Sequence, residues 1–307
     1  MRGPKSDKEM MDSVSLYGMT LEKILDMVAM KVKIAVVQFE VKNVAPKVNL
    51  ERAKKFVRSA SKASANIIVF PENFITSAAT DDGQAADDKN EYRRYFQTLA
   101  KKYRIDIVPG AIIEKYQGAL YLVSYYIDST GEVLAHYKKI NLWHTERETF
   151  TPGKDIAVFK TKYGKVGLII CWDLVYPELF RAMVKRGVEI VICPSAGGYE
   201  DSGKIGNRHD PNNEIKMVDA LCEARAFENE IILVYCNAGG KINIPKPVGK
   251  LTDTLIGHSQ ITVPFKGAVK KLAHNREEMF ITELETDILK DAESVYRIRA
   301  DLKSGKF

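Results

Sequence analysis

The stretch KVGLIICWDLVYPE, Lys165–Glu178, runs from a strand through a cysteine into a helix. Its first part is a continuous apolar run, which is typical of a strand buried on both faces. Pro177 suits the first turn of a helix, and we expect that helix to extend to Arg186. Cys171 then lies at a strand-to-helix turn, with its sulfur facing the positive end of the helix and its pKa lowered. The alternative for a single cysteine is a buried structural residue.

Apolar strands alternate with amphipathic helices on both sides of this stretch. Helices are predicted over Pro46–Ser64, Tyr92–Tyr103 and about Glu214–Asn229, where apolar residues recur at helical spacing. The turn Ser129–Gly131 predicts a hairpin. Strands are predicted for KIAVVQF, NIIVF, RIDIVPGAII, ALYLVSYYI, VLAHYKKI, IAVFKT, VEIVICP, EIILVYCN, HSQITVPF and EEMFITELE. This many strands, with no linker between them, predict one α/β domain of two mixed sheets with helices outside.

The composition argues against several classes of protein. The 307 residues carry 46 Lys and Arg against 40 Asp and Glu, and the net charge of +6 is spread along the chain. We see no helix-turn-helix, base-stacking motif or contiguous basic face, so no nucleic-acid partner is expected. Runs free of charged residues reach about a dozen residues, short of the roughly 20 that a membrane-spanning helix needs. We therefore expect no membrane span.

Cysteine and histidine usage indicates the compartment and the cofactor class. Four cysteines are too few and too irregularly spaced for a disulfide framework, and no pair forms C-x-x-C. A reducing, cytoplasmic setting fits this pattern. The five histidines show no metal-ligand spacing, so no metal is expected. The cysteines expected to be structural are Cys193, Cys222 and Cys236.

Residues 1–30 precede the first predicted strand. Charged residues interrupt the apolar region that a signal peptide would need. The segment TLEKILDMVAM can form a short amphipathic helix, which would be either a loosely attached extension or an oligomer contact. We expect residues 1–30 to be an extension that adds little to the fold.

Two further segments place charged side chains at the ends of predicted strands, where α/β proteins place their active sites. Glu72 follows a buried strand in VFPENF. Lys138 and Lys139 end a hairpin strand, and Glu146 lies seven residues beyond Lys139. Each of these alone could be a solvated charge. Together with Cys171, they form a set of candidate catalytic residues.

The set combines three roles that nucleophilic catalysis needs. A cysteine is a nucleophile, and a carboxyl group whose pKa is raised by burial can take and return its proton. A lysine ammonium stabilises a developing oxyanion, together with the backbone N–H of the residue after the nucleophile, here Trp172. Glu72, Lys139 and Cys171 supply base, electrophile and nucleophile.

From Lys33 to about Asp301 the chain resembles the nitrilase superfamily of carbon-nitrogen hydrolases. The resemblance rests on segments in the right order: PENF, Y-x-K-x-x-L, E-x-x-x-F-x-P-G, C-W-D-x-x-x-P-E, EARAFEN, VYCN and GHSQITVPFKG. It implies a four-layer α-β-β-α sandwich over residues 31–307, with subunits usually paired as a homodimer. It also implies neither a metal nor an organic cofactor.

The resemblance implies a role for each motif residue. Glu72 would be the general base and acid, Cys171 the nucleophile, and Lys139, not its neighbour Lys138, the group that stabilises the oxyanion. Glu146 matches a second glutamate that holds Lys139 and orients substrate. The implied reaction is hydrolysis of a small amide or carbamoyl compound through a Cys171 acyl-enzyme, with release of ammonia or amine.

The substrate is less clearly indicated than the reaction. Asp173 and the Pro177-Glu178 turn resemble the amidase and carbamoylase branches, whereas nitrile-cleaving members typically have Glu after Cys-Trp. A nitrilase and a catalytically inactive scaffold of the same fold stay open.

The loop Gly197–Asn213 either overlooks the pocket or is a mobile surface loop. Val175 and Tyr176 depart from the Arg-aromatic pattern of many amidase-type members. Candidate substrate-binding residues are Asp173, Tyr176, Ser195, Arg208 and Asn237.

Overall fold

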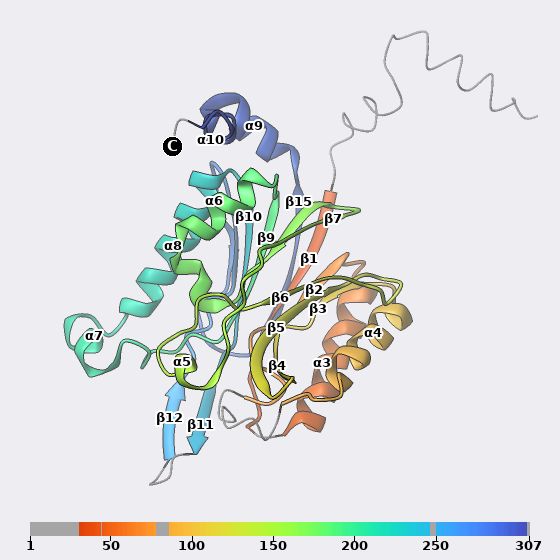
Figure 1. The fold of residues 1–307 in the computed structure, drawn as a ribbon, viewed down its shortest axis with the longest axis vertical. Helices are drawn as coiled ribbons and strands as arrows, with labels where there is room; N and C mark the ends of the chain where they lie inside the picture. Colours follow the sequence, from red (N-terminus) through yellow and green to blue (C-terminus); the bar gives the residue numbers. More distant parts are fainter. Residues whose placement is uncertain (1–30, 44, 78–85, 246–249, 306–307) are drawn as a thin grey trace, which may run out of the picture.

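The computed structural model describes residues 31–43, 45–77, 86–245 and 250–305. Two β-sheets lie face to face, and helices cover the outer face of each, which gives four layers (Figure 1). This arrangement confirms the predicted α-β-β-α sandwich. The predicted extension, residues 1–30, lies outside the described residues.

The first sheet has the order β15-β1-β2-β3-β5-β4, with β6 paired to β5. β1, β2 and β3 run parallel and the other pairings are antiparallel, so the sheet is mixed as predicted. Its strands are β1 (Lys31–Gln38), β2 (Ile67–Val69), β3 (Asp106–Val108), β4 (Ala111–Tyr116), β5 (Ala119–Ile127), β6 (Val133–Lys138) and β15 (Glu278–Glu285).

The second sheet has the order β14-β13-β10-β9-β8-β7, with β8, β9 and β10 parallel. A separate hairpin pairs β11 (Lys241–Pro245) with β12 (Lys250–Thr254). The strands of the second sheet are β7 (Ala157–Thr161), β8 (Gly164–Leu168), β9 (Ile190–Ser195), β10 (Ile232–Asn237), β13 (Gln260–Val263) and β14 (Gly267–Lys271).

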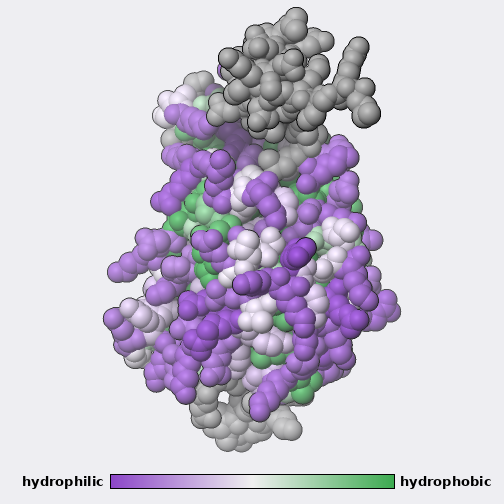
Figure 2. Space-filling view, turned by 90° about the vertical axis from the view of Figure 1, so that its right-hand side faces the viewer, coloured by the Kyte–Doolittle hydropathy of each residue, from purple (hydrophilic) through white to green (hydrophobic). Residues whose placement is uncertain are grey.

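Two long helices cover each sheet. α3 (Pro46–Lys62) and α4 (Glu91–Tyr103) bury their apolar residues on the first sheet, and the side of the molecule that carries them is largely hydrophilic (Figure 2). α6 (Pro177–Lys185) and α8 (Asn213–Asn229) cover the second sheet. Shorter helices are α5 (Glu146–Thr149), α7 (Gly203–His209), α9 (Asp287–Tyr296), α10 (Ile298–Lys303) and the 3-10 helix η2 (Cys171–Val175).

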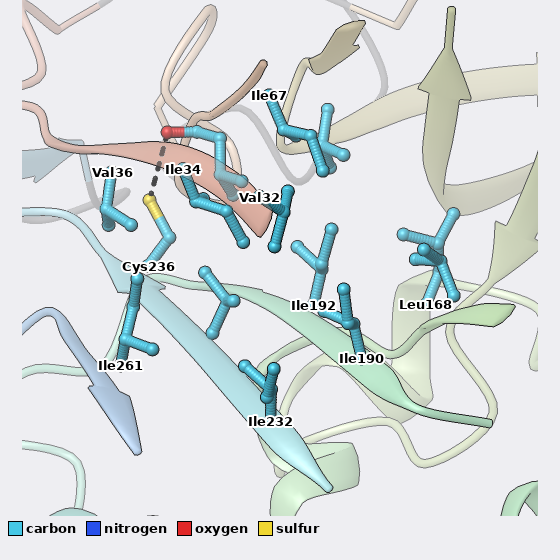
Figure 3. Close-up of a cluster of buried hydrophobic side chains, with 14 of the residues drawn as sticks. Val32, Ile34, Val36, Ile67, Leu168, Ile190, Ile192, Ile232, Cys236 and Ile261 are labelled. Carbon is cyan, nitrogen blue, oxygen red and sulfur yellow. Dashed lines mark hydrogen bonds between the residues drawn. The ribbon is translucent and has the colours of Figure 1, made fainter. Parts of the chain in front are cut away.

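The cluster between the sheets consists mainly of β-branched and aliphatic side chains (Figure 3). Cys236 lies within it, and its Sγ is 3.3 Å and 3.4 Å from the carbonyl oxygens of Val37 and Val69 in the opposite sheet. Cys193 and Cys222 are also fully buried, which confirms that these three cysteines are part of the core. Among the described residues, no helix has both the length and the apolar character needed to cross a membrane.

Three predicted segments differ from the structure. RIDIVPGAII forms two strands, because Pro109 lacks a donor and Gly110 adopts a φ of +72° between β3 and β4. The polar segment Gly197–Asn213 contains α7, whose sequence GKIGNRH has no apolar periodicity to predict a helix. Cys171 begins the 3-10 helix η2 and not α6, so the expected strand-to-helix turn includes a 3-10 turn before Pro177.

Candidate active site

Glu72 lies in the turn after β2 and is enclosed between the two sheets. Its side chain is 2% exposed, and its N–H donates to the Ser195 carbonyl oxygen at the end of β9 at 3.2 Å. Gly110 approaches this turn so closely that a Cβ there would lie 1.9 Å from the Pro71 carbonyl oxygen. The turn therefore has little freedom to move.

Lys139 follows β6 and is only 1% exposed. Its N–H donates to Leu122 at 2.9 Å, and its carbonyl accepts from the Gly153 N–H at 2.8 Å. Its Nζ donates to Glu72 Oε1 at 2.9 Å and to Glu146 Oε1 at 2.8 Å. The structure thus brings these three sequence-predicted residues into direct contact.

Glu146 begins α5, and both of its oxygens have partners. Oε1 accepts from Lys139, and Oε2 accepts from the Trp143 N–H at 2.7 Å. The contact with Trp143 joins the Glu146 carboxylate to the segment between Lys139 and α5. Both the position and the orientation of this carboxylate are therefore fixed.

Cys171 begins η2 with a φ of +47°, a left-handed conformation that non-glycine residues rarely adopt. Such a conformation costs on the order of 1–3 kcal/mol and persists where the surroundings determine it. The thiol interacts electrostatically with the Glu72 carboxylate, the Lys139 ammonium and the Glu146 carboxylate, and the Ala196 backbone favours its charged form. The structure therefore adds Cys171 to the Glu72–Lys139–Glu146 group.

The expected lowering of the Cys171 pKa is wrong. Burial raises the pKa of the thiol well above its ordinary value, and the Glu72 carboxylate raises it further. Lys139 acts in the opposite direction but does not reverse the shift. The local sequence shows the helix that follows Cys171, and it does not show the carboxylate that the fold brings beside the sulfur.

The same surroundings also shift the pKa values of Glu72 and Lys139. Burial raises the pKa of Glu72, although the Lys139 ammonium lowers it in part. Burial disfavours the charged form of Lys139, but Glu72 and Glu146 outweigh it and raise the pKa of Lys139 well above its usual range. Lys139 is therefore a permanent cation, and Glu72 is a carboxyl group suited to exchange a proton.

Three of the candidate substrate-binding residues are buried and contact other parts of the chain. Asp173, Ser195 and Asn237 are 0% exposed. Asp173 accepts four hydrogen bonds from the chain, through both oxygens. Burial raises the pKa of Asp173, and these hydrogen bonds lower it in part.

Asn237 and Ser195 are occupied by contacts within the second sheet and its loops. The Asn237 side chain accepts from the Gly197 N–H at 2.8 Å and donates to the carbonyls of Gly197 and Gly257. The Ser195 hydroxyl lies 3.4 Å from Cys193 Sγ. Asn237 therefore fixes the first residue of the loop 197–213.

The remaining candidates lie nearer the surface. Tyr176 lines a cavity of about 320 Å³ together with residues between Ile140 and Pro152. Arg208 is exposed in the last turn of α7. The Trp172 indole Nε1 is buried and has no hydrogen-bond partner within the described part of the chain.

Sequence reasoning missed the contacts that support these groups. Tyr137 and Asn141 donate to Asp173, and the residue types alone do not reveal which acceptor they meet. Gly153 leaves no room for a side chain, since a Cβ would lie 2.2 Å from the Lys138 carbonyl oxygen. Its place in the E-x-x-x-F-x-P-G segment was the available signal. Across the described residues, no group of three or more His, Cys, Asp or Glu side chains is arranged to hold a metal ion.

Comparison with known proteins defines the class. The family model described as carbon-nitrogen hydrolase matches residues 33–292, so this chain belongs to the carbon-nitrogen hydrolase family of the nitrilase superfamily. This confirms the resemblance found in the sequence.

Individual relatives support the same class. The chain is 31% identical over 285 residues to an N-carbamoylputrescine amidase of Oryza sativa subsp. japonica, covering 88% of this chain and 91% of the relative. It is 30% identical over 280 residues to a probable nitrilase of Schizosaccharomyces pombe, covering 87% and 93%. The crystal structure of a carbon-nitrogen hydrolase from Helicobacter pylori G27 shares the fold, with a TM-score of 0.82, 21% identity and coverage of 91% and 97%.

Proposed function

We propose that this protein is a thiol hydrolase that cleaves the carbon-nitrogen bond of a small amide or carbamoyl compound through an acyl-enzyme on Cys171. The observation that carries the proposal is the buried contact of Lys139 with Glu72 and Glu146, at 2.9 Å and 2.8 Å, next to the Cys171 thiol. A nucleophile, a proton carrier and a fixed cation converge there in an enclosed site, where electrostatic stabilisation is strongest.

In the first half of the reaction, the sulfur of Cys171 forms a bond to the carbonyl carbon while its proton moves to Glu72. The carbonyl electron pair moves to oxygen, where the Lys139 ammonium and the backbone N–H of Trp172 stabilise the charge. The tetrahedral intermediate then expels the nitrogen, which leaves with the proton held by Glu72. A thioester on Cys171 and free ammonia or amine result.

In the second half, water attacks the thioester and gives its proton to Glu72. The intermediate expels the sulfur, which recovers the proton, and the acid is released. The raised pKa of the thiol fits this order of reaction steps. Proton loss is coupled to formation of the carbon-sulfur bond, so no free thiolate has to persist. Glu146 keeps Lys139 in place throughout.

The substrate class is argued from the residues beside Cys171 and from the relatives. Asp173 and the Pro177-Glu178 turn resemble the amidase and carbamoylase branches, and one relative is an N-carbamoylputrescine amidase. The second candidate is nitrile hydrolysis, which the relative described as a probable nitrilase favours. An amide needs a proton delivered to its leaving nitrogen, which Glu72 can supply.

Initial rates on matched amides, carbamoyl compounds and nitriles with one shared side chain test the choice, with ammonia measured directly. We expect amides or carbamoyl compounds to react and nitriles to be poor substrates. Nitriles consumed more than about tenfold faster, a difference of roughly 1.4 kcal/mol in transition-state stabilisation, would replace the amidase proposal by the nitrilase one. If none of the amides, carbamoyl compounds or nitriles is hydrolysed, the result favours an inactive scaffold.

We also propose that the subunits form a homodimer or a higher homo-oligomer in the cytoplasm. The exposed rings of Phe227, Phe265 and Tyr296 support the pairing, since they contact one another at centroid distances of 5.2 Å and 5.5 Å and form an apolar surface. The free cysteines fit a reducing compartment. Light scattering should give twice the chain mass or a higher multiple of it, and the mass of a single chain would contradict the pairing.

A further inference from the structure

Asp173 contacts the segment that carries Lys139 on both sides of that lysine. Its Oδ2 accepts from the Tyr137 hydroxyl at 2.8 Å. Its Oδ1 accepts from the backbone N–H of Asn141 at 2.8 Å and from the side-chain amide of Asn141 at 2.9 Å. Tyr137 and Asn141 are each two residues from Lys139, so the carboxylate fixes the segment before and after it.

The same carboxylate closes the turn that carries Cys171. Its Oδ2 also accepts from the Ile170 N–H at 3.0 Å, and the Asp173 N–H returns a hydrogen bond to the Ile170 carbonyl at 3.1 Å. These two contacts enclose the left-handed Cys171 from both sides in sequence. One buried side chain thus holds the segments of both reacting groups.

This link matters because Lys139 and Cys171 come from different sheets. Lys139 follows β6 of the first sheet, and Cys171 follows β8 of the second. Hydrophobic packing between sheets is not directional, whereas hydrogen bonds to an enclosed carboxylate are short and directional. A shift of about 1 Å in a catalytic group can lower a rate by as much as a hundredfold.

We propose that Asp173 is a positioning residue, which acts through Tyr137 and Asn141 to hold Lys139 in register with Cys171. This inference rests on the proposed function, in which Lys139 stabilises the oxyanion. Asp173 is fully enclosed and all four of its hydrogen bonds are to the chain, so it acts on the reaction through the residues that it holds.

The fold supplies a matched control. Tyr126 donates to Asp106 at 2.8 Å, the same distance as Tyr137 to Asp173. Both tyrosines lie in the cluster between the sheets and are 0% and 1% exposed. The Tyr126–Asp106 contact joins β5 to β3 within one sheet and touches neither Lys139 nor Cys171.

The test compares Tyr137→Phe with Tyr126→Phe, which each remove one buried hydroxyl and keep the ring. Tyr137→Phe also removes the acceptor of the Ile140 N–H, at 3.3 Å, so its melting temperature should fall somewhat further than that of Tyr126→Phe. The pH profile of Cys171 alkylation by iodoacetamide, followed by mass spectrometry, should move to higher pH in Tyr137→Phe alone. The reason is that the Lys139 charge lowers the pKa of the thiol, and a displaced Lys139 does so less. On an amide substrate, kcat should fall about tenfold or more with little change in KM.

An unchanged alkylation profile in a folded Tyr137→Phe protein, or an equal shift in both variants, would overturn the proposal. If Tyr137→Phe does not melt cooperatively, Asn141→Ala replaces it with the same expected shift, because it removes only the side-chain amide contact. Alkylation needs no substrate. A wild-type protein that hydrolyses no amide, carbamoyl compound or nitrile would therefore refute the proposed function, while the alkylation profiles still decide on Asp173.

Discussion

Lys138 and Lys139 are neighbours in sequence but point to opposite faces of the first sheet. Lys138 pairs with Val123 on the helix-covered face, and its Nζ lies 3.7 Å from the centroid of the Tyr121 ring. Lys139 lies on the face toward the second sheet, beside Glu72. The alternation of side chains in strands explains why the two lysines have different surroundings.

Replacing these lysines separately tests which of them acts in the reaction. Lys139→Ala should lower kcat by on the order of a hundredfold or more, the scale for loss of an oxyanion donor. Glu72→Gln should have a similar effect through loss of proton transfer. Lys138→Ala should be mild. Equal losses from both lysines in steady-state kinetics would contradict the assignment.

At this scale, residue types could be predicted from the sequence, but their surroundings could not. Glu72, Lys139, Glu146 and Cys171 were found from their motifs, and the fold brings them together. Asp173 is a candidate substrate-binding residue in the sequence, and nothing in C-W-D shows the donors that enclose it. The thiol pKa differs from the sequence prediction for the same reason, since desolvation depends on contacts distant in sequence.

Among the elements, short turns between strands position the reacting groups. The Glu72 turn packs on Gly110, which adopts a φ of +72° between β3 and β4. Gly118, in the β4–β5 turn, has a φ of +84°, and a Cβ there would meet nothing within 4 Å. The two glycines have comparable backbone conformations but different surroundings.

Alanine substitutions at Gly110 and Gly118 distinguish the effect of backbone strain from the effect of displacing the Glu72 turn. Both variants carry a strain of about 1–2 kcal/mol from the left-handed conformation. Gly118→Ala should therefore lower the melting temperature slightly and keep kcat. Gly110→Ala must also move the Pro71 carbonyl, so it should lower the melting temperature further and reduce kcat strongly. Indistinguishable variants would show that the Gly110 contact does not support the site.

Most strands and the helices α3, α4, α6 and α8 follow from hydrophobic periodicity, and their predicted bounds agree closely with the structure, whereas β11, β12, β14, α9 and α10 were not predicted. α3 ends at Lys62 and α4 begins at Glu91, within two residues of the expected bounds. Short elements without periodicity, such as α7 and η2, were not predictable in this way. Their form depends on contacts with the loops around them.

Across the whole molecule, partly buried carboxyl groups are expected to make stability depend on pH. Burial raises the pKa of Glu114 to about 7 and that of Asp201 to about 7, from ordinary values of about 4. A raised pKa in the folded state means that the folded protein binds the proton more tightly. The stabilisation is therefore fully present below the unfolded-state pKa of about 4, and is lost as pH rises through about 7.

The melting temperature should accordingly fall between about pH 4 and pH 7. Glu114→Gln keeps an acceptor for the Tyr125 hydroxyl and removes one of the titrating groups, so it should flatten this decline. Glu91→Gln, at the exposed start of α4, serves as the control. A decline as steep in Glu114→Gln as in the wild type, measured by calorimetry across this range, would contradict the account.

The central claim is that Cys171 carries the acyl group during turnover, and mass spectrometry of acid-quenched reactions tests it most directly. With an amide substrate, the account predicts an adduct with the mass of the acyl group on the peptide containing Cys171. The adduct should be absent from Cys171→Ala and should decay as the acid product appears. An adduct found only on Cys193, Cys222 or Cys236, or product formation by Cys171→Ala at the wild-type rate, would contradict it.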